Sequence, residues 1–175
     1  RAVELRLDAW LASSARHPLV LRGARQVGKT WLVRDLAARA GRQLVEINFE
    51  RDPALKRLFS TNDPRQILGE LSLALSVDIN PDRSLLFLDE IQAAGTVLAK
   101  LRWFYEELPQ LPVVAAGSLL EFSLADHAFS MPVGRIAFQH IEPMGFPEYL
   151  RAHGQDRLLS VISAWRPGRK LSVAA

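Results

Sequence analysis

Apolar and polar positions along the first part of the chain change between helical spacing and short continuous runs. Residues 2–13 place apolar side chains among charges at roughly helical spacing, which predicts an amphipathic leading helix. The apolar run at residues 19–21 is too short for a buried helix and a glycine closes it, so we predict a buried strand. Residues 30–40 return to helical spacing and end at Gly41, which predicts a helix with a glycine stop.

The same alternation continues to residue 153. Further strands are predicted at residues 44–49, 85–88, 112–116 and 136–141, and further helices at residues 54–59, 64–75, 97–108 and 146–153. Asp63 is expected to cap the helix that begins at residue 64. The continuous apolar run at residues 85–88 is typical of a central parallel strand that is covered on both faces. Five strands with helical connections predict an α/β fold with a doubly wound parallel sheet and helices on both faces, in which ligands bind beyond the C-terminal strand ends.

Length and composition favour one globular domain. The chain has 175 residues, which suit one α/β domain with a sizeable core. Its 49% hydrophobic and 23% charged residues are typical of a soluble protein, and no apolar run is long enough to span a membrane. There is no cysteine, which excludes disulfides, thiolate metal sites and cysteine nucleophiles. Because no charged-then-apolar leader is seen either, we expect a cytoplasmic protein without membrane contact.

The net charge of +3 arises at the C-terminal end of the chain. Residues 1–150 hold 17 Lys and Arg against 18 Asp and Glu, whereas residues 151–175 hold five basic residues against one acidic residue. This segment lacks the interleaving of basic and aromatic residues that base-stacking surfaces use. The basic excess therefore favours a solvated tail over a nucleic-acid contact.

A phosphate-binding motif stands between the first predicted strand and the helix that follows it. The sequence GARQVGKT at residues 23–30 fits G-x-x-x-x-G-K-[ST] in full. In such a loop the glycines let the backbone N–H groups point inward, while the helix N-terminus and the Lys29 ammonium attract the β- and γ-phosphates. Thr30 is predicted to bind Mg²⁺ through its hydroxyl. The motif indicates phosphate binding and does not by itself decide whether the nucleotide is hydrolysed. The residues predicted to contact the nucleotide are Gly23, Ala24, Arg25, Gln26, Val27, Gly28, Lys29, Thr30 and Trp31.

An acidic pair, Asp89 and Glu90, follows the apolar run at residues 85–88. In a parallel sheet this strand end meets the same edge as the phosphate loop. We predict that Asp89 holds Mg²⁺ through water and that Glu90 orients or deprotonates the water that attacks the γ-phosphate. Carboxylates at such a position also commonly cap the next helix, and the upstream phosphate loop is what favours the catalytic interpretation.

Two further polar residues stand beside predicted strands. Ser118 follows the strand at residues 112–116, and we predict that its hydroxyl senses the γ-phosphate or holds the attacking water; a turn or cap role is the alternative. Arg135 precedes the last strand, and we expect it either to reach bound phosphate in its own or a neighbouring subunit or to form a surface salt bridge. The predicted catalytic residues are thus Lys29, Glu90, Ser118 and Arg135, and a homo-oligomer is compatible with them.

Several segments, in the same order, resemble the AAA-like P-loop ATPases of bacteria and archaea that pair an N-terminal ATPase domain with a C-terminal domain of unknown function. They are LRGARQVGKTWLVR, VEINFERDP, LLFLDEIQ, RWFYEELP, AAGSLLEF and MPVGRI. The resemblance covers about residues 16–154. It implies a P-loop core with sheet order 5-1-4-3-2, ATP as the nucleotide, Glu90 as catalytic base and Ser118 in the sensor position.

Members of that family continue into a helical region and a second domain, so the resemblance implies a truncated chain. We expect residues 1–154, with residues 1–15 as a leading helix, to form the P-loop domain. Residues 155–175 show no clear periodicity and are expected to be a basic tail, disordered or the non-native end of the truncated chain. A protein or DNA partner would then bind through the missing domain. The leading hypothesis is Mg²⁺-dependent ATP hydrolysis coupled to a conformational change, and the alternative is a nucleotide-dependent protein- or DNA-binding switch with little or no turnover.

Overall fold

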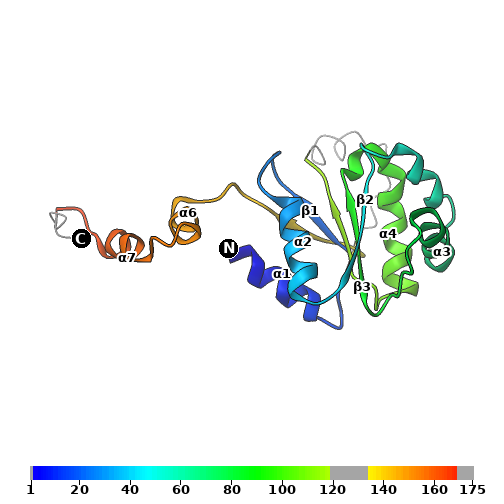
Figure 1. Ribbon diagram of the computed structural model, residues 1–175, viewed down its shortest axis with the longest axis horizontal. Coiled ribbons are helices and arrows are strands. Elements are labelled where there is room, and N and C mark those ends of the chain that lie inside the picture. Colours follow the sequence, from blue (N-terminus) through cyan, green and yellow to red (C-terminus); the bar gives the residue numbers. More distant parts are fainter. Residues whose placement is uncertain (1, 119–133, 169–175) are drawn as a thin grey trace.

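Five parallel strands form the centre of the protein, whose computed structural model describes residues 2–118 and 134–168 (Figure 1). The strands are β1 (Leu19–Arg22), β2 (Gln43–Asn48), β3 (Ser84–Asp89), β4 (Val113–Ala116) and β5 (Ala137–His140). Their order across the sheet is β2-β3-β4-β1-β5, and every neighbouring pair is parallel. Counted from the other edge this order is 5-1-4-3-2, so the predicted doubly wound P-loop sheet is confirmed.

Helices cover both faces of the sheet, as the sequence predicted. The α-helices are α1 (Ala2–Ala12), α2 (Lys29–Arg39), α3 (Pro64–Leu75), α4 (Gly95–Glu107), α6 (Phe146–Ala152) and α7 (Asp156–Ala164). Two 3-10 helices, η1 (Pro53–Phe59) and η2 (Ile91–Ala94), precede α3 and α4. In Figure 1, α1 and α2 lie on one side of the sheet and α3 and α4 on the other. The segment predicted as a helix at residues 54–59 is thus the tighter 3-10 form, and η2 was not predicted.

The α3 boundary follows from a local cap. Asp63 precedes the helix, and its Oδ1 accepts hydrogen bonds from the backbone N–H groups of Arg65 at 2.8 Å and Gln66 at 3.4 Å. These N–H groups lack partners within the helix, so the carboxylate satisfies them. Pro64 occupies the first helical position, where its missing N–H costs nothing. The cap predicted from the sequence is confirmed.

Strand β3 contributes to both halves of the core, because its side chains alternate between the two faces of the sheet. Leu85 and Phe87 pack with the buried residues of α1 and α2, whereas Leu86 and Leu88 pack with those of α3 and α4. All six residues of β3 are buried. Burial on both faces explains the continuous apolar run and carries the polar residues that follow it to the C-terminal edge of the sheet.

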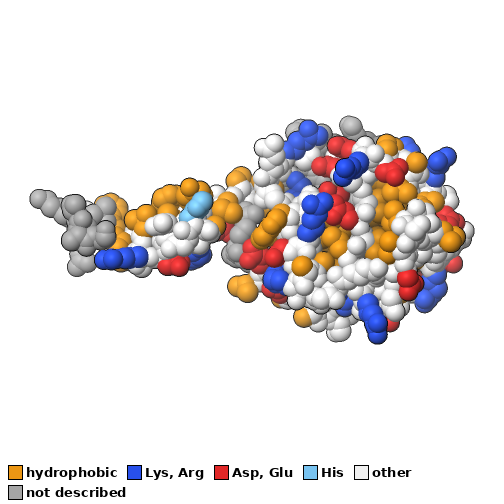
Figure 2. Space-filling view, viewed as in Figure 1, with side chains coloured by type: hydrophobic (Ala, Val, Ile, Leu, Met, Phe, Trp, Pro, Cys, Tyr) orange, Lys and Arg blue, Asp and Glu red, His pale blue; other side chains and the backbone are white. Residues whose placement is uncertain are grey.

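The C-terminal helices α6 and α7 extend away from the sheet and contact each other (Figure 1). The expectation of a tail without regular structure is corrected for Asp156–Ala164, which form α7. Leu158 and Ile162 lie one helical turn apart. The helix is too short for this spacing to repeat often enough to be recognised in the sequence. Both side chains remain partly exposed, and Figure 2 shows hydrophobic side chains gathered over this part of the molecule. No helix within residues 2–118 and 134–168 is long and apolar enough to cross a membrane.

Candidate functional site

The segment between β1 and α2 is a tight loop whose backbone repeatedly enters the left-handed region. The φ angles are 136° at Gly23, 64° at Gln26 and 92° at Gly28. Left-handed residues in such a loop turn successive N–H groups towards one side and create a concavity that attracts anions. The first N–H groups of α2, which begins at Lys29, have no acceptor within the helix and add the positive end of its dipole. The loop and helix therefore form a local site for an anion.

Gly23→Ala is expected to destabilise the fold by about 2–5 kcal/mol, because the added Cβ has no room and φ suits only glycine. A Cβ at this position would lie 2.1 Å from the carbonyl oxygen of Ile141, just after β5. Gly69→Ala is the matched control: Gly69 is exposed on α3, nothing lies within 4 Å of the added Cβ, and the change should stabilise by about 0.5–1 kcal/mol. Chemical denaturation measures both, and effects of the same sign would contradict this account.

Lys29 lies beneath the loop with only 8% of its surface exposed. Its Nζ donates hydrogen bonds to the carbonyl oxygens of Gly23 at 2.9 Å and Ala24 at 2.8 Å. Burial lowers the pKa of Lys29, while the negative charges of Glu90 and Asp89 oppose that shift. The ammonium is thus held by two carbonyls of the loop, close enough to Glu90 and Asp89 to interact with both charges.

Asp89 ends β3 and is buried at 5% exposure. Its Oδ2 accepts from the Thr30 hydroxyl at 3.1 Å and from Nδ2 of Asn48 at 3.5 Å, and its Oδ1 accepts from the backbone N–H of Glu90 at 3.1 Å. Burial raises the pKa of Asp89, and the Thr30 hydrogen bond opposes that shift. Mg²⁺ sites commonly combine one or two protein oxygens with phosphate and water, so the adjacent oxygens of Thr30 and Asp89 fit such an ion.

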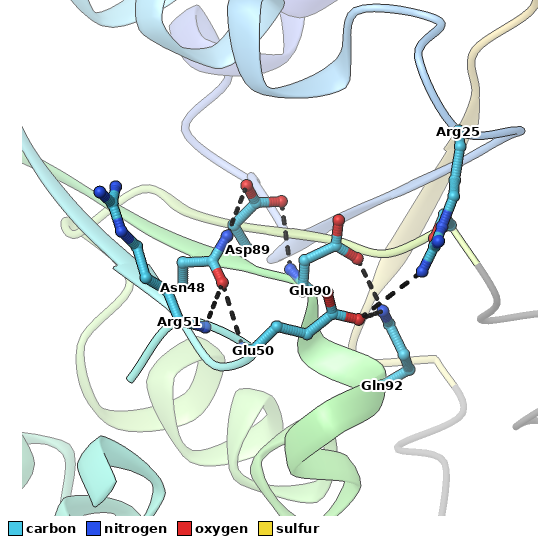
Figure 3. Close-up of polar contacts among 8 residues, drawn as sticks. Arg25, Asn48, Glu50, Arg51, Asp89, Glu90 and Gln92 are labelled. Atoms are coloured by element: carbon cyan, nitrogen blue, oxygen red, sulfur yellow. Dashed lines mark hydrogen bonds and ion pairs between the residues drawn. The ribbon is translucent and has the colours of Figure 1, made fainter. Parts of the chain in front are cut away.

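Glu90 and its neighbours form a second polar cluster beside Asp89 (Figure 3). Nε2 of Gln92 donates to Oε2 of Glu90 at 2.6 Å and to Oε1 of Glu50 at 3.2 Å. Oδ1 of Asn48 accepts from the backbone N–H groups of Glu50 and Arg51, at 3.1 and 2.9 Å, and so turns the chain towards the site after β2. The sequence predicted no role for these neighbours of Glu90. The segments VEINFERDP and LLFLDEIQ contain them and are the signal that points to them.

Arg25 connects this cluster to the end of β4. Its Nε donates to Oγ of Ser118 at 3.3 Å, and its guanidinium lies 3.9 Å from the Glu50 carboxylate. Both Arg25 contacts are exposed, and through them one side chain joins Ser118 to Glu50. Arg25 therefore has side-chain contacts within the site, beyond the backbone contacts that the sequence required of it.

A cavity of about 410 Å³ joins these groups at the C-terminal edge of the sheet. Among the residues predicted from the sequence, its lining includes Arg25, Gln26, Gly28, Lys29, Thr30, Trp31, Asp89, Glu90 and Ser118. A larger cavity of about 1030 Å³ shares part of that lining and extends between the loop, α1, the segment before α6 and α6 itself. Ala24 and Val27 line this second cavity, and the exposed indole of Trp31 borders both. The structure thus brings the loop, the acidic pair and Ser118 together.

Arg135 lies elsewhere. Its Nε donates to Oε1 of Glu106 at 2.8 Å, and the same carboxylate accepts from Arg102 at 3.0 Å. Of the two interpretations that the sequence left open, the surface salt bridge is the one observed within this chain. A contact of Arg135 with phosphate in a neighbouring subunit stays a prediction, as do a homo-oligomer and a protein or DNA partner.

Comparison with known proteins gives a family and distant structural likenesses, two of which are described here. The family described as "AAA domain" matches residues 15–150. No curated protein matches the chain. The Walker-type ATPase paby2304 of Pyrococcus abyssi is 21% identical, with a TM-score of 0.49 over 87% of this chain and 58% of that one. PCH-2 of C. elegans is 15% identical, with a TM-score of 0.48 over 95% of this chain and 48% of that one, so this chain spans about half the length of these structures.

Proposed function

This chain belongs to the AAA domain family, and from that membership we propose that it binds ATP with Mg²⁺ and hydrolyses the bound nucleotide, coupled to a conformational change. The observation that carries the proposal is the 3.1 Å hydrogen bond between the Thr30 hydroxyl and the Asp89 carboxylate. It joins the first turn of the helix after the phosphate loop to the end of a different strand, 59 residues later. A metal and a triphosphate need these two elements at the same place.

The phosphates are bound by the loop and Lys29. We assign the β- and γ-phosphates to the concavity formed between Gly23 and Gly28, where the positive end of α2 favours negative charge. The Lys29 ammonium exchanges its two carbonyl acceptors for phosphate oxygens, which are charged and therefore accept stronger hydrogen bonds. The buried ammonium thus gains a partner that compensates its charge better than the loop does.

The residues for Mg²⁺ are Thr30 and Asp89. A bound Mg²⁺ ion would be held by oxygens of these two residues and would neutralise negative charge on the phosphates. Asn48 contacts the Asp89 oxygen that also accepts from Thr30, so it orients the carboxylate from outside the metal's own ligands.

Glu90 is the base for the attacking water. The water oxygen forms a bond to the γ-phosphorus, the bond from that phosphorus to the bridging oxygen breaks, and the Glu90 carboxylate accepts the water proton. The products are ADP and phosphate. Ser118, which lines the same cavity, is assigned to the γ-phosphate or the attacking water.

The nucleoside end of ATP is assigned to the larger of the two cavities. Trp31 borders both cavities, and the side chains of Leu5 and Met144 give the larger one an apolar wall. An aromatic and apolar surface next to a phosphate site suits a base and ribose, which bury mostly carbon and a π-face. The choice of adenine over other bases rests on the family.

Release of phosphate from ATP by the purified chain tests the proposal. We expect release that requires Mg²⁺ and stops when the metal is chelated, with a turnover number within the ordinary enzyme range of about 1–10³ per second or slower in the absence of a partner. The assay is run with and without DNA, alongside a direct measurement of ATP binding. Saturable binding without release would contradict hydrolysis and support the nucleotide-dependent switch; neither binding nor release would contradict both.

A further inference from the structure

Gln92 lies in η2, two residues after Glu90, and its side chain joins the carboxylates of two different strand ends. Its Nε2 donates to Glu90, which follows β3, at 2.6 Å, and to Glu50, which follows β2, at 3.2 Å (Figure 3). A side-chain amide carries two N–H groups, so both hydrogen bonds form at once. One neutral group thus holds two negative charges side by side without adding a charge of its own.

The oxygen of the same amide has the opposite character. Within residues 2–118 and 134–168, Oε1 of Gln92 is buried and has no hydrogen-bond partner. An unpaired buried acceptor is destabilising, and an apolar side chain of the same size would avoid it. Turning the amide over would place the oxygen against both carboxylates, so the orientation follows from the hydrogen-bond network. The oxygen therefore does not explain an amide at this position, whereas its N–H groups, which hold the carboxylates of Glu90 and Glu50, do.

Glu90 is a residue whose backbone is fixed but whose side chain needs an anchor. Its φ of 51° lies in the left-handed region, its N–H donates to Asp89, and its carbonyl accepts from the backbone N–H of Ala93 at 3.0 Å. The carboxylate lies beyond three rotatable bonds, and Gln92 is the hydrogen-bond donor that contacts it among the described residues. Displacing a reacting group by about 1 Å costs on the order of 100-fold in rate, so this anchor matters for a base.

Resting on the hydrolysis proposed above, we propose that Gln92 is a positioning residue for Glu90. Its amide N–H holds Oε2 of the carboxylate and leaves Oε1 for the attacking water, while its second N–H keeps Glu50 in place. Gln92 is not part of the lining of the phosphate-loop cavity. It acts on the water through Glu90 and does not contribute to the binding of ATP.

Gln92→Met tests this role, because methionine has nearly the same length but neither the donor nor the unpaired oxygen. We expect kcat to fall by about 10- to 100-fold, with KM and Kd for Mg²⁺-ATP changed by less than about twofold. The melting temperature should change little, because removal of the buried unpaired acceptor offsets the loss of two hydrogen bonds to carboxylates that solvent also reaches. A fall in kcat without a loss of stability or affinity is a result that a merely structural glutamine does not give.

Gln66→Met is the matched control. Gln66 also donates its Nε2 to a glutamate, Glu70, at 3.0 Å, but this pair lies exposed on α3 and outside the cavity, so kcat should not change. Gln92→Glu keeps the shape of the amide and replaces its donor by an acceptor, and kcat should fall at least as far as in Gln92→Met; this variant decides the matter if Gln92→Met does not fold.

Two results would overturn the inference. One is unchanged turnover in the Gln92 variants, and the other is a fall in kcat that a loss of ATP affinity and melting temperature fully accounts for. The unsubstituted chain is measured in the same assay. If it binds ATP but releases no phosphate, the proposed hydrolysis fails and takes this inference with it, whereas release by the unsubstituted chain and by Gln92→Met at equal rates refutes the inference alone.

Discussion

Lys29→Ala is expected to abolish measurable ATP binding by this chain, with at least a ~100-fold loss of affinity. Hydrogen bonds to charged groups contribute about 1.5–3 kcal/mol each, and each ~1.4 kcal/mol is tenfold in Kd. In the unsubstituted chain the negative charges of Asp89 and Glu90 interact with the Lys29 ammonium and oppose the lowering of its pKa by burial. Without the ammonium, the triphosphate would face these two carboxylates directly. The substitution therefore removes an attraction and leaves a repulsion. Calorimetric titration with Mg²⁺-ATP measures the effect.

Lys100→Ala is the control for Lys29→Ala. Lys100 lies on α4, donates to Oδ1 of Asn62 at 2.6 Å and is absent from the lining of the phosphate-loop cavity. Its removal changes the net charge by the same amount, and ATP affinity should stay within about twofold because an exposed charge is screened by solvent and salt. Melting temperatures of both variants separate lost binding from lost folding. Equal affinity of the Lys29 variant and the unsubstituted chain would end the proposal of a phosphate site at this loop.

The fold could be predicted from the sequence where burial controls the pattern. The apolar run of β3 is continuous because side chains on both faces are covered, and the Asp63 cap is a local interaction of adjacent residues. The order of the strands did not follow from periodicity, which says nothing about neighbours in a sheet, and came from the resemblance to a family. Helix α7 was missed because its apolar residues remain partly exposed and span too few turns.

Only those residues of the candidate site that belong to a motif or follow a predicted strand could be predicted from the sequence. The loop at residues 23–30 and Asp89 followed from the motif and from the common edge of a parallel sheet. The contact of Gln92 with Glu50 depends on the register that pairs Asn48 with Asp89. Apolar patterns alone leave such a register open to slips of two residues, because these keep the same faces buried. Contacts that depend on the register between two strands therefore cannot be predicted from the pattern of apolar residues along a single sequence.

Glu90→Gln is expected to separate binding from hydrolysis. The variant should bind Mg²⁺-ATP with equal or higher affinity, because one of the negative charges that face the triphosphate is removed. Its rate of hydrolysis should fall by about 10²–10⁴-fold, the usual contribution of a general base. Glutamine keeps the length of the side chain and an oxygen that still accepts from Gln92. The fall in the rate of hydrolysis is therefore caused by the missing base and not by a displaced loop. Single-turnover kinetics measure the step directly.

Glu70→Gln supplies the matched comparison for Glu90→Gln, because Glu70 also accepts a hydrogen bond from a glutamine, Gln66, but does so on the exposed face of α3. Its hydrolysis rate should equal that of the unsubstituted chain. Hydrolysis by the Glu90 variant at the unsubstituted rate would assign the proton transfer to another group in the cavity. Gln92 would then have no catalytic base to position, and the role proposed for it would be refuted. Tight binding combined with lost turnover would instead place the chemistry at the carboxylate that Gln92 holds.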